Sequence, residues 1–357
     1  MTHAPPDDLA PQPAAHATAL PAHFYVDPAM PALDRRAVFD RAWQLVAHVA
    51  QLRDAGDHVV ADLAGLPVVA VRGDDGAIHV LHNVCRHRAG PIAACDGRGA
   101  KALRCRYHGW TYALDGRLRS ATEMGGADGF DVANVRLPQL DVRVWQGLVF
   151  ACIDPGRAPP FEAVVAGIDA RLGPTRGLEA YGHHRHVAYD VACNWKVYVD
   201  NYLEGYHVPH VHPGLNRLLD YRSYATELAE WHSLQWSPLE SDPALYGDGD
   251  ALYYWLWPNT MLNVLPGRLQ TNRVQPLGAD RCRVHFDFHY AGDDAARQAA
   301  DLAFSDEVQH EDLAICEDVQ RGLASGSYVA GRLNPLRETG VHHFHERLRA
   351  AYRDDAA

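Results

Sequence analysis

Two short pairs of cysteine and histidine constrain the fold of this chain more than any other feature. Cys85 and His87 form a Cys-x-His pair, and Cys105 and His108 form a Cys-x-x-His pair after 17 intervening residues. A structural zinc site usually takes its cysteines from one arm and its histidines from the other, whereas each arm here carries one of each. The alternatives are a zinc site, a redox cluster, or chance in a chain with 22 histidines.

The mixed donor set suits a [2Fe-2S] cluster in which one iron takes two thiolates and the other takes two imidazoles. Gly90 and Gly109 follow the pairs, where the backbone must turn tightly. By this pattern the stretch resembles a Rieske centre. Rieske proteins of respiratory complexes have two further cysteines that form a disulfide, but the equivalent positions here hold Gly90 and Tyr107. The stretch is therefore similar to the oxygenase type, and Cys95, which matches no ligand position, is expected to pack in the interior.

The composition indicates a globular protein with room for two domains. The chain has 357 residues, of which 47% are hydrophobic and 22% charged. A net charge of -12 argues against nucleic-acid binding, because such proteins use clustered Lys and Arg to neutralise phosphates. The N-terminal residues lack the features of a secretory signal, and the seven cysteines favour metal or redox use over disulfides. No apolar run approaches the ~18 residues of a membrane span, so we expect a cytoplasmic protein with no membrane partner.

The first half of the sequence predicts a small all-β domain. Residues 1–22 are rich in Pro and Ala and predict a flexible arm. Residues 35–47 have the spacing of a helix, with Val38, Phe39, Trp43 and Val46 on one face. From 57 to 152 the pattern changes to short β-branched runs separated by Asp-Gly turns. We therefore expect the cluster domain, with its N-terminal helix, to span residues 35–155.

The second half predicts an antiparallel α+β domain over residues 160–350. A Pro-rich boundary at 151–161 separates it from the first domain. A helical stretch at 193–208 is followed by several strands between 251 and 292, and then by a long helix over 295–323. Strands followed by a long helix are typical of α+β domains.

A second group of ligand-type residues lies in this domain. Glu204 and His207 are spaced i, i+3 and are expected on one helical face. Pro209 is expected to break that helix and to bring His212 beside His207. Two imidazoles and one carboxylate form the facial triad of non-haem Fe(II), which leaves positions open for O2 and substrate. His210 lies between the two proposed ligands and is the main competitor for the iron.

The third iron ligand is predicted in the long helix. A stripe at helical spacing on that helix is formed by Phe304, Val308, Asp312, Ile315, Val319 and Leu323. A carboxylate within an apolar stripe is costly unless it is paired or binds a metal. We therefore choose Asp312 as the ligand, with Glu311 as the alternative.

The two motifs, in this order, resemble those of the α subunits of Rieske non-haem iron oxygenases. The resemblance extends from about residue 38 to 345 and rests on CRHRAGP, CRYHGWTYALDG, NWKVYVDNYLEGYHVPHVHP and EDLAICEDVQRGL. It implies a C-terminal helix-grip domain with mononuclear Fe(II) in a deep pocket. It also implies an oxidoreductase that activates O2 to hydroxylate or demethylate a small organic substrate, with electrons from NADH or NADPH delivered by a separate flavin and iron–sulfur reductase.

The same resemblance implies a ring of subunits, usually a trimer, in which the cluster of one subunit serves the iron of its neighbour. Glu204 holds the position of the acidic residue that bridges the two centres, with His108 and His207 as its partners. Many members have Asp at this position, and the Glu is more similar to members that act on quaternary amines.

The sequence leaves the chemical class of the substrate undecided. The motifs resemble choline monooxygenase-like members, and an aromatic cage for a trimethylammonium group is expected from Tyr202, Tyr206, Trp255 and Trp257, with Tyr253 and Tyr254 beside them; alternating aromatics on strands are also typical of a sheet core. The alternative enzymatic function is hydroxylation or O-demethylation of an aromatic acid, for which Arg268 and Arg273 are candidates to bind the carboxylate. Single or double oxygen insertion is equally open. A Rieske-type electron carrier and a zinc-stabilised interaction module are the alternatives without catalysis.

Overall fold

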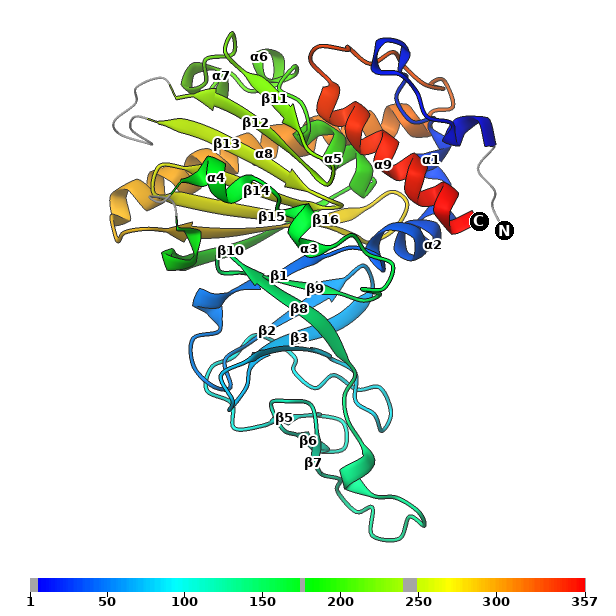
Figure 1. Ribbon diagram of the computed structural model, residues 1–357, viewed down its shortest axis with the longest axis vertical. Helices are drawn as coiled ribbons and strands as arrows, with labels where there is room; N and C mark the ends of the chain where they lie inside the picture. The colour runs from blue at the N-terminus through cyan, green and yellow to red at the C-terminus, as the bar shows by residue number, and fades with distance from the viewer. Residues whose placement is uncertain (1–5, 174–176, 240–248, 357) are drawn as a thin grey trace. The chain divides into compact units, whose positions relative to one another are not determined.

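The chain divides into two compact units, shown in Figure 1. The computed structural model describes residues 6–173, 177–239 and 249–356. The Cys/His unit comprises Ala42–Ala158 and Gly177–Ala180, and the helix–sheet unit comprises Met1–Arg41, Pro159–Arg176 and Tyr181–Ala357. No helix among the described residues is both long and apolar enough to cross a membrane.

The Cys/His unit is built from antiparallel strands, as predicted. Its larger sheet has the order β1-β9-β8-β4-β3-β2, formed by β1 (Gln44–His48), β2 (His58–Leu63), β3 (Leu66–Arg72), β4 (Ile78–His82), β8 (Gln139–Trp145) and β9 (Leu148–Cys152). A small sheet contains β5 (Leu103–Arg104), β6 (Thr111–Tyr112) and β7 (Leu118–Ser120). The predicted Asp-Gly turn between β3 and β4 is present, with φ of 80° at Gly76.

The helix–sheet unit contains a seven-stranded antiparallel sheet with the order β10-β16-β15-β14-β13-β12-β11. Its strands are β10 (Gly182–Val191), β11 (Ala225–Leu228), β12 (His232–Pro238), β13 (Asp250–Leu256), β14 (Thr260–Leu265), β15 (Arg268–Pro276) and β16 (Cys282–Tyr290). Its helices are α1 (His23–Val26), α2 (Met30–Asp34), α3 (Phe161–Val164), α4 (Ile168–Leu172), α5 (Trp195–Tyr202), α6 (Val208–Val211), α7 (Leu215–Leu218), α8 (Ala295–Ala324) and α9 (Thr339–Ala356). The predicted α+β class is confirmed.

The helices α5 and α8 pack together against this sheet (Figure 1). The side chain of Asn194 caps α5 by accepting a hydrogen bond from the N–H of Lys196. Lys196 is fully buried, and its Nζ lies 2.5 Å from Oδ2 of Asp34, which also accepts from the Trp195 indole at 2.8 Å. Because a buried ammonium is stable only when it is paired and hydrogen-bonded, this contact fixes α5 against α2.

One row of side chains crosses the sheet beneath the helices. The register places Gln235 opposite Tyr253, Tyr253 opposite Asn263, and Asn263 opposite Gln270. Directly opposed residues on neighbouring strands point to the same face. Strands β12 to β15 therefore present a polar and aromatic floor to the space under α5 and α8.

Some predicted elements differ from the structure. The helix expected over 35–47 ends at Phe39 as a π-helical turn, and residues from Gln44 form β1, because the apolar run there is buried in a sheet on every residue. Residues 6–22 of the expected arm are bound to the helix–sheet unit, for example through the backbone of Ala19, which donates to Gly331; residues 1–5 lie outside the described residues. The strands between 251 and 292 and the long helix are confirmed.

Candidate metal centres and substrate cavity

Three predicted iron ligands meet under α8. One ligand atom each from His207, His212 and Asp312 lies within 4.8 Å of the others. Nε2 of His212 is 3.0 Å from Oδ1 of Asp312, and Nε2 of His207 is 3.8 Å from the same oxygen. Two imidazoles and one carboxylate on one side of an ion match the donors that non-haem Fe(II) requires.

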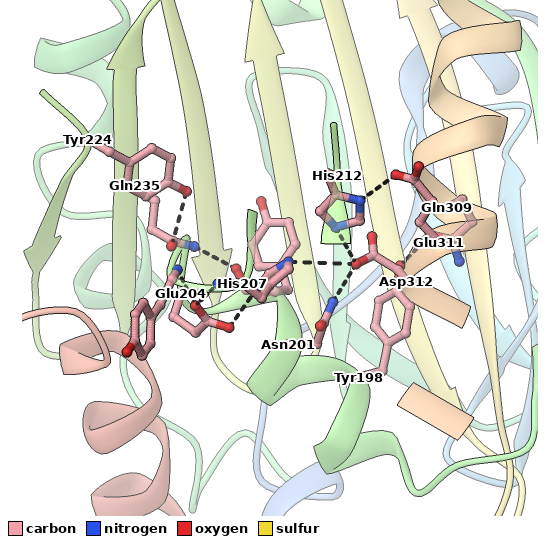
Figure 2. Close-up of polar contacts among 12 residues, drawn as sticks. Tyr198, Asn201, Glu204, His207, His212, Tyr224, Gln235, Gln309, Glu311 and Asp312 are labelled. Carbon is pink, nitrogen blue, oxygen red and sulfur yellow. Dashed lines mark hydrogen bonds and ion pairs between the residues drawn. The ribbon is translucent and has the colours of Figure 1, made fainter. Parts of the chain in front are cut away.

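A carboxylate contacts the Nδ1 atom of each histidine (Figure 2). Oε1 of Glu204 is 2.6 Å from Nδ1 of His207, and Oε2 of Glu311 is 2.7 Å from Nδ1 of His212. These contacts fix the tautomer that leaves Nε2 able to bind a metal, as outer carboxylates do at metal sites. Burial lowers the pKa of His212, but Asp312 and Glu311 together raise it above its ordinary value. Glu311 thus contacts the far side of His212, and the geometry favours Asp312 as the ligand.

The loop that carries these residues differs from the prediction. Helix α5 ends at Tyr202, so Glu204 and His207 lie in the turn before α6 rather than on one helical face. The Glu204 carboxylate accepts from the N–H groups of Tyr206 and His207 and stabilises that turn. Pro209 lies in the first turn of α6, where a backbone N–H would have no partner within the helix. It therefore begins a helix instead of breaking one.

His210 does not join the group. It is exposed to solvent and lies outside both the group of metal-type ligands and the cavity described below. The short helix α6 rotates it away from its neighbours in sequence. The direction of its side chain therefore favours His207 and His212 over His210 as the proposed iron ligands.

A cavity lies beside the three ligands, between α5, α8 and the sheet. Its floor includes the polar row on β12 to β15, and its aromatic lining consists of Tyr198, Tyr202, Tyr224, Tyr253, Phe286 and Phe304. Its apolar lining includes Val208, Leu215, Leu218, Leu219 and Val308. Asn201 donates to Oδ1 of Asp312 at 2.6 Å and so restricts the orientation of that carboxylate.

Most of the predicted aromatic cage lies elsewhere. Tyr202 lines the cavity, but Trp255 is fully buried against Phe344 of α9, with ring centroids 5.4 Å apart. Trp257 lies beyond the end of β13 and also packs on Phe344. Tyr206 is 47% exposed and is outside this cavity. The aromatic residues of β13 extend past the cavity to the residues that pack on α9, so only some of them face the cavity.

The two arginines considered for binding an aromatic acid also lie in different places. Arg268 lines the cavity, but its Nε donates to Asp301 at 2.7 Å and its NH2 donates to Gln270. Arg273 lies outside the lining residues. Neither side chain presents an uncommitted guanidinium to a bound carboxylate.

The loops of the first motif have matching backbone geometry. In each loop the cysteine carbonyl accepts a hydrogen bond at 3.0 Å from the residue four positions later, Ala89 in the first loop and Gly109 in the second. Both of these residues have positive φ, 56° and 75°. Gly90 was expected to provide the turn. Instead, its missing side chain lets the backbone of the first loop approach the second loop, since a Cβ there would lie 3.0 Å from Sγ of Cys105.

The four side chains of these loops fit an iron–sulfur cluster. Cys85 and Cys105 are 5% and 2% exposed, and burial raises the pKa of Cys105. The rings of His87 and His108 lie 4.6 Å apart, and Nδ1 of His87 is buried without a hydrogen-bond partner among the described residues. Positive iron would stabilise both thiolates and use the unpartnered nitrogen.

Two supporting residues of this centre were missed by the sequence analysis. The Tyr112 hydroxyl lies 3.2 Å from Sγ of Cys85 and accepts from the N–H of Arg86. The Trp110 indole stacks on His87 with centroids 4.8 Å apart and 6° between planes. The sequence could have indicated them by their position, because they follow the second Cys/His pair directly, where the chain leaves the loop and enters β6. Cys95, which was expected to pack in the interior, is exposed.

Comparisons with known proteins agree with both centres. Residues 42–137 match the Rieske [2Fe-2S] domain, and residues 178–354 match the ring hydroxylating alpha subunit (catalytic domain). The choline monooxygenase, chloroplastic, of Arabidopsis thaliana is 36% identical over 350 residues, which cover 93% of this chain and 82% of the relative.

The chain belongs to the Rieske non-haem iron oxygenases, as an α subunit.

Further relatives and solved structures extend the comparison. The carnitine monooxygenase oxygenase subunit of Escherichia coli (strain K12) is 30% identical over 94% of each chain. A solved quaternary ammonium Rieske monooxygenase, described for carnitine oxidation by gut microbiota, has a TM-score of 0.90 at 27% identity, with 98% of this chain and 99% of that chain covered. Naphthalene 1,2-dioxygenase from Rhodococcus sp. shares the fold, with a TM-score of 0.75 at 17% identity.

As a member of this family, the chain is an oxidoreductase with a Rieske [2Fe-2S] cluster and a mononuclear iron as cofactors. It is an oxygenase component that uses O2 and electrons from a partner reductase. The catalytic domain excludes the readings as a bare electron carrier and as a zinc-stabilised interaction module.

Proposed function

We propose that this oxygenase hydroxylates a small quaternary ammonium compound at an iron held by His207, His212 and Asp312. The observation that carries the proposal is the pair of carboxylates on the two Nδ1 atoms, which leaves both Nε2 atoms directed at Asp312. When bound, the iron supplies O2 activation, with one electron from itself and one from the cluster. The protein residues orient the donors and enclose the substrate.

The cavity supports a cationic substrate. It is lined by the carboxylates of Glu204 and Asp312 together with several tyrosine rings, and aromatic faces attract quaternary ammonium groups. The one arginine among the described lining residues, Arg268, is paired with Asp301. The named relatives act on choline and carnitine. The described lining offers no uncommitted guanidinium to the carboxylate of an aromatic acid, which disfavours that alternative.

We assign Cys85, His87, Cys105 and His108 as the cluster ligands. Their support is the buried pair of thiols, the adjacent imidazoles and the hydrogen bond from Tyr112 to Cys85. Neutral imidazoles leave the cluster less negative than four thiolates would, and this raises its reduction potential. These four side chains would hold the cluster, which would supply one-electron transfer.

Glu204 is assigned as the bridge between the centres of neighbouring subunits in a homotrimer. One of its oxygens already contacts Nδ1 of His207. Asp200 and Glu338 add negative charge to the groove that Glu204 lines, whereas exposed arginines surround the cluster loops, namely Arg86, Arg88, Arg104 and Arg106. Complementary charge favours docking of one subunit's cluster loops on the next subunit's groove.

The apolar lining has a role in the reaction. Leucines and valines line the cavity with Asp312 and limit water near the ligands, which would favour oxidation of the substrate over side reactions with solvent. Asn201 holds Asp312 in one orientation through its 2.6 Å hydrogen bond. The substrate C–H is thereby brought against a fixed ligand set.

A single-turnover assay tests this function. The purified holoprotein is reduced, so that no reductase is needed, and O2 is added with choline, carnitine, glycine betaine, benzoate or a methoxybenzoate. Mass spectrometry identifies the products. We expect an oxidised or dealkylated quaternary amine together with reoxidation of the cluster. A product from the benzoates alone would overturn the substrate assignment and leave the family assignment intact.

A further inference from the structure

A second hollow shares one wall residue with the cavity. This outer hollow has a volume of about 190 Å³ and is lined by Gly205, Tyr206, Tyr221, Tyr224, Leu336 and Arg337, among others. Tyr224 also lines the cavity beside the proposed iron ligands. Because Tyr224 is partly exposed and belongs to both linings, its side chain forms the wall between the two spaces.

Two contacts hold the Tyr224 ring in this wall. Its hydroxyl donates to Oε1 of Gln235 at 3.2 Å (Figure 2), which is long for a hydrogen bond between two oxygens. A Cβ on Gly205 would lie 2.7 Å from the ring, so the ring packs on the backbone that follows Glu204. Tyr224 immediately precedes β11, the edge strand of the sheet. One weak hydrogen bond therefore keeps the hydroxyl end of the ring in place.

The cavity has little room while the ring is in this position. Its volume is about 120 Å³, whereas an apolar cavity of about 150 Å³ holds one benzene molecule. A quaternary ammonium compound with an extended chain has more non-hydrogen atoms than benzene and exceeds this space. The outer hollow, at about 190 Å³, is large enough to receive an aromatic ring. Movement of the Tyr224 ring into it would leave the space of the ring to the ligand.

Other tyrosines of the described cavity lining are held more firmly. Tyr202 donates to Asn263 at 2.7 Å, and Tyr198 donates to Gln309 at 2.7 Å. Neither tyrosine lines the outer hollow, so neither has that space to move into. Their shorter hydrogen bonds and the lack of adjoining room make Tyr224 the tyrosine whose movement costs least.

We propose that Tyr224 determines the chain length of the substrate, because its ring must move into the outer hollow before an extended quaternary ammonium compound fits the cavity. With the ring in the wall, the cavity accepts compact cations. The inference rests on the function proposed above, in which the ammonium group is bound near Glu204 and Asp312. It adds a residue that selects among such cations by size.

Two cations that differ in chain length test this role. Calorimetry on the oxidised holoprotein, without turnover, gives the dissociation constants of tetramethylammonium and hexyltrimethylammonium. Tyr224→Phe removes the hydrogen bond that movement of the ring must break, and a neutral hydrogen bond is worth about fivefold in an equilibrium constant. We expect this variant to bind hexyltrimethylammonium about fivefold more tightly and tetramethylammonium as before. Unchanged binding of hexyltrimethylammonium, or an equal change for both cations, would overturn the proposal.

A variant that fills the outer hollow should have the opposite effect. Ala225 lines that hollow at the start of β11, and the larger side chain of Ala225→Leu leaves the ring less room. Hexyltrimethylammonium should bind about fivefold more weakly or worse, while tetramethylammonium is unaffected. This variant keeps the proposal testable if Tyr224→Phe does not fold, and unchanged binding of the longer cation would count against it.

The matched control is another tyrosine with a hydrogen-bonded hydroxyl. Tyr189 donates to Asp306 at 2.8 Å and lines neither space. Tyr189→Phe should leave both dissociation constants unchanged. A gain for hexyltrimethylammonium equal to that of Tyr224→Phe would mean that the effect does not come from the wall, and the proposal would be wrong.

Failure of this inference can be told apart from failure of the function. If tetramethylammonium binds and neither Tyr224→Phe nor Ala225→Leu changes the relative affinity of the two cations, the assignment of a quaternary ammonium substrate stands, but Tyr224 has no role in selecting its length. If neither cation binds the unaltered protein, the proposed function fails and the inference fails with it.

Discussion

Glu311 provides a quantitative test of how the iron site is built. The variant Glu311→Gln keeps the shape of the side chain but removes its charge from the 2.7 Å contact with Nδ1 of His212. Loss of an outer partner of a metal-bound histidine typically weakens metal binding 10- to 100-fold. The amide oxygen can still accept from Nδ1–H, so we expect the lower limit, about tenfold or ~1.4 kcal/mol.

The assay measures iron retention against a competing chelator. The protein is incubated with graded concentrations of a colorimetric Fe(II) chelator, and the mononuclear iron removed is followed while visible absorbance reports the intact cluster. Glu307 is exposed on the same helix, so Glu307→Gln is the matched control and should retain iron like the unaltered protein. Equal retention in Glu311→Gln and the control would refute the supporting role of Glu311 and weaken the assignment of His212.

Three further predictions follow from contacts in both units. Measured on protein loaded with iron, Glu204→Gln should slow reoxidation of the cluster in single turnover, because the contact with His207 loses its charge; an unchanged rate would remove the bridging role. Tyr112→Phe removes the hydrogen bond to Cys85, which stabilises the more negative reduced cluster, and should lower the potential in voltammetry by about 40 mV if the bond is worth ~1 kcal/mol; an equal or higher potential would contradict this. Asp57 is 3% exposed; burial raises its pKa, but hydrogen bonds from Asp54, Gly99 and Arg98 lower it below its ordinary value. Its stabilisation is therefore present above pH ~4 and is lost as pH falls through the lowered value, so Asp57→Asn should cost about 2 kcal/mol in denaturant unfolding at pH 7 and progressively less in acid. A loss that stays constant down to pH ~2 would refute the charge argument.

The grouping of His207, His212 and Asp312 was predictable, because metal chemistry limits the type and spacing of ligand residues. Two Cys/His pairs and a His-rich motif followed by a distant carboxylate restrict the possible centres strongly. The long helix was predicted from an apolar stripe at helical spacing, although the buried residues of that helix are mostly polar, such as Ser305 and Gln320, and Val319 of the stripe is 45% exposed. Asp312 was preferred to Glu311 because only Asp312 lies on that stripe.

The surroundings of the ligands were less predictable because they depend on tertiary packing. The apolar residues of 44–48 fit a helix or a strand equally well, and neighbouring strand β9 decides between them. Trp255 and Tyr253 are alternate residues of one strand, yet one packs under α9 and the other faces the cavity. A period of two gives the face of the sheet but not what covers it.

The most direct test of the central claim is electron paramagnetic resonance of the reduced protein with nitric oxide, which reports a mononuclear Fe(II) site separately from the Rieske signal. The comparison is between His207→Ala and His210→Ala, two histidines of one short segment, of which the structure places only His207 at the ligand group. We predict that both variants keep the Rieske signal and that only His207→Ala loses the Fe(II)–nitric oxide signal. Loss of that signal in His210→Ala, with its retention in His207→Ala, would contradict the iron site described above.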